Sequence, residues 1–90
     1  MSLLELQEHF VVHSIEKREL SNEGLAKDLN MILDKIQNGE YQYNHTYDKR
    51  LSQEIERILY HIEQGQVVTF EEYMIIAIFV LSLKETSNQL

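Results

Sequence analysis

Two stretches of the sequence, LAKDLNMILDKIQNG at residues 25–39 and LSQEIERILYHIEQG at residues 51–65, repeat one pattern and decide the fold. In each stretch large aliphatic residues stand at i, i+4, i+7, i+8 and i+11, which places them along one face of an α-helix. These residues are Leu25, Leu29, Ile32, Leu33 and Ile36 in the first stretch and Leu51, Ile55, Ile58, Leu59 and Ile62 in the second. The glycine that ends each stretch is typical of a helix C-terminus with left-handed backbone geometry. We therefore predict two helices that pack antiparallel through matching apolar faces.

A further helix is predicted at the N-terminus, from Leu3 to about Arg18. Ser2 and Glu5 have the spacing of a capping box, in which each side chain bonds to the backbone amide of the other residue. The helix that contains the first repeat is expected to begin after a cap at Ser21 or Asn22.

The last predicted helix runs from Phe70 to about Lys84, and Thr69 with Glu72 forms a second capping box at its start. Residues 73–81 are all apolar, and periodicity alone would also allow a buried strand there. The cap and the lack of a recognisable partner strand favour a helix, which must be central in the fold or partly exposed for a partner. The expected fold is all-α, a single-domain antiparallel four-helix bundle over residues 1–90 with no sheet.

Composition limits the classes of function. The formal net charge of −7 disfavours a nucleic-acid partner, because such binding depends on cationic contacts to phosphate. The absence of cysteine excludes disulfides, thiolate catalysis and cysteine-ligated metals. The N-terminus lacks the basic start and long apolar run of a signal peptide, and no apolar run is long enough to span a membrane, so we expect a cytoplasmic protein.

Residue patterns for catalysis and metal binding are weak. His9 and His13 stand four residues apart, a spacing that could present two imidazoles to one metal, but Phe10 replaces the glutamate of a HExxH motif. We interpret both as surface histidines. Glu71 and Glu72 fall in a first helical turn, where the helix dipole favours them for structural reasons. No phosphate-binding glycine loop or nucleophile motif is found. We expect a protein that is not an enzyme and has no cofactor or metal.

Aromatic residues supply the candidate binding site. Tyr41, Tyr43 and Tyr47 are concentrated in the predicted loop of residues 39–47, after which Asp48 is expected to cap the next helix. Tyrosines are enriched at binding surfaces, although one or two of these could instead fold back over the end of the bundle. On the last helix, Tyr73 and Phe79 are the candidate contacts for a protein partner.

The stretch from Leu25 to Leu83 resembles the immunity proteins that protect bacteria against pediocin-like (class IIa) bacteriocins, in particular the enterocin A immunity type. The residues that carry this resemblance are Lys35-Ile36 with Tyr41, then Leu51, Ile55 and Leu59-Tyr60, then Val68-Thr69-Phe70-Glu71-Glu72-Tyr73, and finally Ile78 with Leu81-Ser82.

The resemblance implies a cytoplasmic four-helix bundle without cofactor that protects the producing cell at the mannose phosphotransferase permease, the membrane receptor of the bacteriocin. It also implies that the C-terminal half helps to determine which bacteriocin is resisted. The alternative from another class is a phage-type or regulatory adaptor that inhibits a cytosolic enzyme or transcription factor through the same kind of helical surface. A third possibility is an acid-lined metal or small-molecule site.

Overall fold

The computed structural model describes the backbone of residues 2–16 and 21–86, and the side chains of all of these except residues 13–16. In chain order the elements are α1 (Leu3–Glu16), α2 (Asn22–Gln37), β1 (Tyr41–Tyr43), the 3-10 helix η1 (Thr46–Arg50), α3 (Leu51–Glu63), α4 (Phe70–Leu81) and β2 (Leu83–Glu85). The described chain is therefore mostly helical, as predicted, with a small sheet that was not.

Short polar side chains begin three of the helices at the positions that the sequence predicted. Ser2 and Glu5 bond reciprocally to each other's backbone N–H groups at 3.1 and 3.2 Å. The Ser21 hydroxyl accepts a backbone N–H from the first turn of α2. Thr69 and Glu72 form the capping box of α4. Each of these bonds satisfies a backbone donor that has no partner within its own helix.

Glycines end α2 and α3, again as predicted. Gly39 and Gly65 have φ angles of 82° and 78°, a region that residues with a Cβ rarely adopt. After Gly39 the Glu40 N–H turns back to the Lys35 carbonyl at 2.9 Å, and the same bonding pattern follows Gly65. Both helices therefore end in a Schellman motif, which satisfies carbonyls of the last turn.

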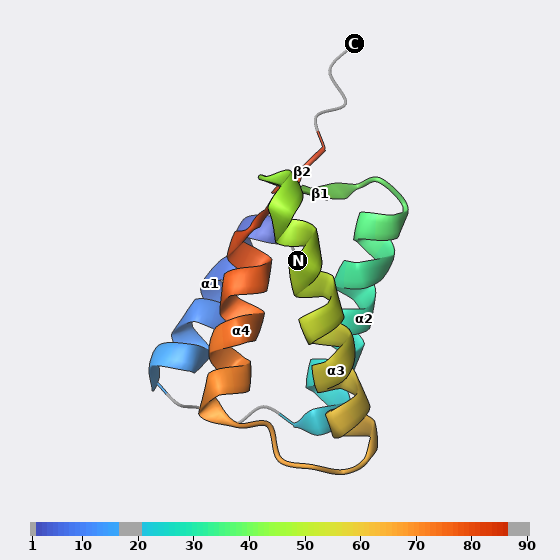
Figure 1. Cartoon of the computed structure of the whole chain (residues 1–90). Coiled ribbons are helices and arrows are strands. Elements are labelled where there is room, and N and C mark those ends of the chain that lie inside the picture. The colour runs from blue at the N-terminus through green and yellow to red at the C-terminus, as the bar shows by residue number, and fades with distance from the viewer. Residues whose placement is uncertain (1, 17–20, 87–90) are drawn as a thin grey trace.

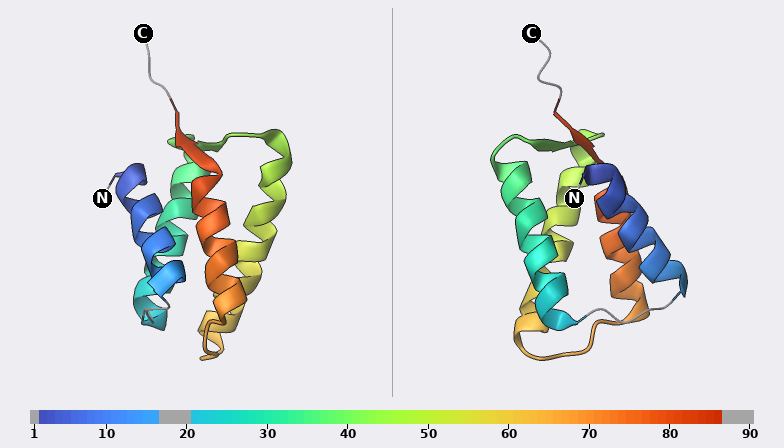
Figure 2. Two further views of the ribbon diagram at one scale, coloured as in Figure 1. Left: turned by 90° about the vertical axis from the view of Figure 1, so that its left-hand side faces the viewer. Right: turned by 180° about the vertical axis from the view of Figure 1, so that it is seen from behind.

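The four α-helices lie side by side and surround one apolar core. Figures 1 and 2 show that successive helices run in alternate directions along the long axis. The helix α4 packs against both α1 and α3, and α3 also packs against α2. The residues that meet in the core come from all four helices, both strands and the segment before α4: Leu3, Leu6, Phe10, Leu25, Leu29, Ile32, Tyr41, Ile55, Ile58, Leu59, Ile62, Val68, Ile76, Phe79, Val80 and Leu83. Most of the two predicted apolar faces is thus buried, whereas Leu33, Ile36 and Leu51 are only partly buried.

A two-stranded antiparallel sheet closes one end of the helical body, where the sequence predicted only a loop and the last turn of a helix. Gln42 pairs with Lys84, and the sheet is extended by bonds from Asn44 N–H to the Ser82 carbonyl and from Thr86 N–H to the Glu40 carbonyl. Figure 1 shows the two strands together at the end of the molecule where α2 and α4 end. The prediction of a fold without sheet was wrong because strands of three residues are too short to show a period.

The start of α3 also differs from the prediction. Residues 46–50 already turn as the 3-10 helix η1, and Asp48 lies inside it rather than at a cap. The N-cap position of α3 is Arg50, which has helical backbone angles and makes no capping hydrogen bond with its side chain. Because η1 runs directly into α3, the first N–H groups of α3 can bond to carbonyls of η1, and no side-chain cap is required.

The apolar run at residues 73–81 is helical, as predicted, and lies within α4. No helix in the described part of the chain is both long and apolar enough to cross a membrane.

Candidate interaction surface on α4 and α1

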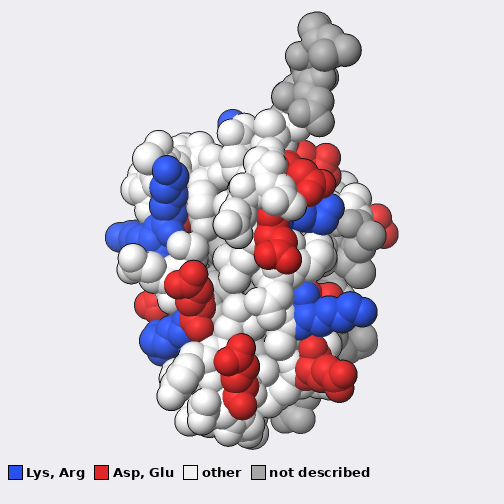
Figure 3. Space-filling model, turned by 90° about the vertical axis from the view of Figure 1, so that its right-hand side faces the viewer, with Lys and Arg blue, Asp and Glu red and all other residues white. Residues whose placement is uncertain are grey.

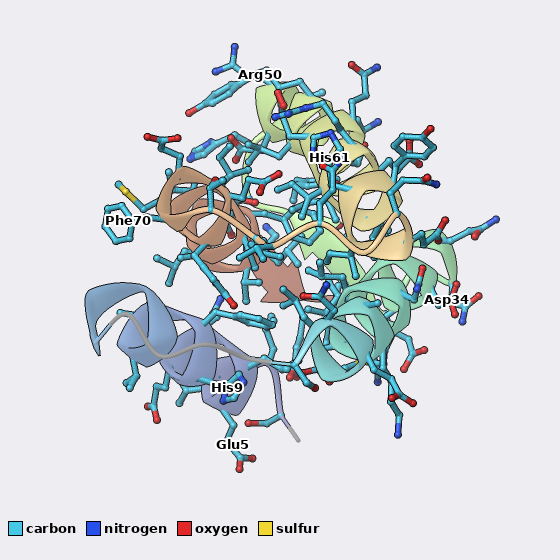
Figure 4. The ribbon with its side chains drawn as sticks, turned by 90° about the horizontal axis from the view of Figure 1, so that it is seen from below. Glu5, His9, Asp34, Arg50, His61 and Phe70 are labelled. Carbon is cyan, nitrogen blue, oxygen red and sulfur yellow. The ribbon has the colours of Figure 1, made fainter. Side chains whose placement is uncertain are left out.

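One side of α4 exposes large apolar side chains to solvent. Phe70, Met74, Ile78 and Leu81 are between 44% and 53% exposed. At about 100° per residue these four positions fall within an arc of roughly 80° around the helix, so they share one face. Figure 4, which views the molecule along its long axis, shows the Phe70 side chain directed away from the helical body.

The neighbouring helix α1 extends this exposed face. Leu4 is 63% exposed, Val12 is 41% exposed and Val11 is partly buried. With Leu81 and the polar residues Gln7 and Glu8, they line a shallow depression between the two helices. We call Leu4, Val11, Val12, Phe70, Met74, Ile78 and Leu81 together the α4–α1 surface. Several exposed apolar side chains on neighbouring helices mark an interaction site more often than scattered single residues do.

The two α4 residues that were predicted from the sequence to contact a partner do not lie on this face. Phe79 is fully buried in the core, so its predicted position as an outward contact was wrong. It follows Phe70 by nine positions, which is half a turn around the helix from the exposed face. Tyr73 is partly buried and packs against the core cluster. In a run where every residue is apolar, ring size does not indicate which side faces outward.

The three tyrosines before α3 are divided between the core and the surface. Tyr41 is buried, and the Lys35 ammonium lies 5.4 Å from the centre of its ring. Tyr43 is partly buried and its ring lies 6.3 Å from that of Phe79. Burial raises the pKa of both hydroxyls, more than the Lys35 charge lowers that of Tyr41. Two of the three therefore cover the end of the helical body, which was the alternative considered for them.

Tyr47 is 65% exposed and stacks on the His45 ring at 5.2 Å between centres. It belongs to η1, whereas the α4–α1 surface is made of α4 and α1 alone. The five nominated residues, Tyr41, Tyr43, Tyr47, Tyr73 and Phe79, consequently do not form one surface.

The structure also joins two polar residues that the sequence did not connect. The Nδ1 atom of His61 on α3 lies 3.0 Å from a Glu72 carboxylate oxygen, and Glu72 is only 8% exposed. Burial by itself raises the pKa of Glu72. The hydrogen bonds from the Thr69 backbone N–H and from His61 lower it by more than burial raises it, so the pKa of Glu72 in the folded protein is below its ordinary value. The Glu72 carboxylate thus links the start of α4 to the end of α3.

No group of three or more histidine, cysteine, aspartate or glutamate side chains within the described residues could hold a metal ion. His9 is partly buried and packs edge-on against the Phe10 ring at 5.2 Å. The His13 side chain, the other half of the predicted surface pair, lies outside the described residues.

Comparison with models of known protein families, with curated proteins and with solved structures finds no match to this chain.

Proposed function

We propose that this protein acts by binding another protein through the α4–α1 surface, and that it is not an enzyme. The observation that carries the proposal is the row of Phe70, Met74, Ile78 and Leu81, four large apolar side chains that are about half exposed on one side of α4. Covering such a surface releases about 25 cal/mol for each Å² of apolar area removed from water. An apolar face on a partner, such as one side of a helix, would be complementary to it.

The more specific proposal is that the chain is a cytoplasmic antiparallel four-helix bundle that serves as an immunity protein against class IIa bacteriocins. Two points support it: the sequence resemblance between Leu25 and Leu83, and the location of an exposed apolar face on the C-terminal helix, where that resemblance implies a role in specificity. The partner would be the membrane permease that the bacteriocin uses as its receptor, contacted from the cytoplasmic side.

The test is to express the protein in a strain that is sensitive to class IIa bacteriocins and to measure survival against a panel of them. The parent protein should protect the strain, and Ile78→Gln should abolish protection. Tyr60→Gln is the matched control, since Tyr60 is an exposed residue on α3, outside the α4–α1 surface.

Each variant must retain the helical circular dichroism and the Tm of the parent, so that lost protection reports lost contact. If a well-expressed parent protects against no member of the panel, the immunity assignment is wrong, and the adaptor alternative replaces it. If Tyr60→Gln and Ile78→Gln lose protection equally, the α4–α1 surface is not the contact.

A further inference from the structure

A cleft of about 730 Å³ opens between α2 and α3 at the end of the molecule that carries the sheet. Leu33 and Ile36 of α2 form one wall, Ser52 and Glu56 of α3 the other, and residues 41–44 lie across the end. Figure 3 shows the side of the molecule formed by α2 and α3, where acidic and basic side chains are interspersed with uncharged surface. The cleft shares no residue with the α4–α1 surface.

One edge of β1 has no partner strand. In an antiparallel pair of strands, hydrogen-bonded residues alternate with residues that do not bond to the partner strand. Residues 44 and 40 bond to residues 82 and 86, so Gln42, rather than Tyr41 or Tyr43, exchanges hydrogen bonds with β2. The N–H and C=O groups of Tyr41 and Tyr43 therefore point to the opposite edge, and among the described residues no other strand pairs with them. Both tyrosines also line the cleft, so this unpaired edge borders it.

The other edge of the sheet is covered. The side-chain amide of Gln7 on α1 donates to the Leu83 carbonyl of β2 at 3.3 Å, and the Glu85 carboxylate accepts the Leu3 N–H at 3.4 Å. Exposed strand edges attract additional strands, and proteins commonly cover them. Here α1 covers β2, whereas the edge of β1 faces the cleft.

A second unsatisfied group lies beside the same edge. The Tyr43 hydroxyl is buried and has no hydrogen-bond partner among the described residues. The Ser52 side chain lies near it, and the Ser52 hydroxyl donates to the Lys49 carbonyl at 2.8 Å.

We propose that the cleft binds an extended peptide segment, which adds to the free edge of β1 as a third strand and carries a basic side chain toward Glu56. An extended peptide is the one ligand whose N–H and C=O groups repeat at the spacing of a strand edge. The basic side chain follows from charge: Glu56 is an exposed carboxylate on the wall of the cleft and the whole chain has a net charge of −7, although Lys49 also lines the cleft. A second copy of this chain fits less well, since two proteins of that charge repel each other.

The proposal can be tested by selecting binders to the full-length protein from a display library of short random peptides. Enriched peptides should be rich in β-branched and basic residues, and a labelled synthetic copy should bind in solution. In ¹⁵N-edited NMR spectra, saturation with this peptide should slow hydrogen exchange of the Tyr41 and Tyr43 amides about tenfold or more. The Gln42 amide, which is already paired with β2, should change little.

Two pairs of variants locate the peptide. Thr46→Trp, an exposed position that lines the cleft, should weaken binding about tenfold, or 1.4 kcal/mol, whereas Gln53→Trp on the outer side of α3 should not. Glu56→Lys should weaken peptide binding about threefold, which is the scale of an exposed ion pair. Glu63→Lys makes the same charge change on the same helix outside the cleft, so it should have little effect on binding.

The proposal is wrong if no peptide is enriched, if the enriched peptides are acidic, or if their binding shifts amides of α1 and α4 while leaving β1 unchanged. It is also wrong if the Tyr41 and Tyr43 amides become protected without peptide as protein concentration rises, since a second copy would then occupy the edge. These outcomes are independent of the protection assay above.

Discussion

Replacement of Glu72 by alanine should lower the free energy of unfolding by about 2–3 kcal/mol. Its carboxylate accepts the Thr69 backbone N–H at 2.9 Å and lies 3.0 Å from His61 Nδ1. Loss of an N-terminal cap costs about 1 kcal/mol. Loss of a hydrogen bond to a charged group costs about 1.5–3 kcal/mol, and the lower part of this range applies because the His61 side chain is 32% exposed.

A domain of this size loses about 4–8 °C in Tm for each kcal/mol, so the expected fall is roughly 8–24 °C. Thermal unfolding followed by circular dichroism measures it, with Thr69→Ala and Glu72→Gln alongside. Thr69→Ala should cost about 1 kcal/mol. Glu72→Gln should cost less than Glu72→Ala, because glutamine can still complete a capping box.

The pH dependence separates the charge of Glu72 from its capping geometry. The pKa of Glu72 in the folded protein is below its ordinary value of 4.5, so the folded state binds this proton less tightly than the unfolded state does. The stabilisation is therefore complete above pH 4.5 and is lost as the pH falls through the folded-state pKa. The difference in Tm between the parent and Glu72→Gln should shrink over that range. Glu5, whose pKa is also lowered by its bonds to Ser2, is present in both proteins and cancels in the comparison.

If Glu72→Ala melts within a degree or two of the parent at pH 7, neither the capping box nor the His61 contact stabilises the fold. If the difference between the parent and Glu72→Gln is the same at pH 7 and pH 3.5, the charge of Glu72 does not contribute to stability.

Three further predictions concern the core, a helix end and metal binding. Leu29→Ala should lower the free energy of unfolding in urea by about 2–5 kcal/mol, since Leu29 is fully buried. Leu4→Ala, at a position that is 63% exposed, should lower it by under about 0.5 kcal/mol, and equal losses would contradict the assigned core. Gly39→Ala should lower the free energy of unfolding by about 1–2 kcal/mol, because a φ of 82° is unfavourable for alanine even though no atom lies within 4 Å of the added Cβ. No loss would show that this helix end rearranges freely. Stoichiometric Zn²⁺ should leave the Tm unchanged, and a clear rise would overturn the interpretation of His9 and His13 as surface residues.

Most helix boundaries could be predicted from the sequence because the interactions that set them are local. The capping boxes join residues three positions apart, and the Schellman motif after Gly39 joins Lys35 to Glu40. The repeated aliphatic pattern indicates burial, since polar or charged residues occupy most of the positions between the aliphatic ones. Where such a contrast was present, as in α2 and α3, the buried face of the helix followed from it.

The candidate interaction site could not be predicted in the same way. Residues 73–81 are all apolar, so nothing in their order shows which of them α1 and α3 will cover. The neighbouring helices bury Ile76, Phe79 and Val80 and leave Met74 and Ile78 exposed. The every-fourth spacing from Phe70 to Ile78 is a possible signal for the exposed face, but the opposite face has the same spacing.

Contacts between residues distant in the chain decided the rest. Gln42 pairs with Lys84 only because α2 and α4 end at the same end of the molecule, and His61 meets Glu72 only because α3 and α4 pack side by side. The sequence by itself determined most of the helix ends, since those bonds span no more than five residues, but not the start of α3 or the end of α4. The tertiary structure alone determined which apolar face and which strand edge remain open to a partner, because burial depends on neighbours that the local sequence does not specify.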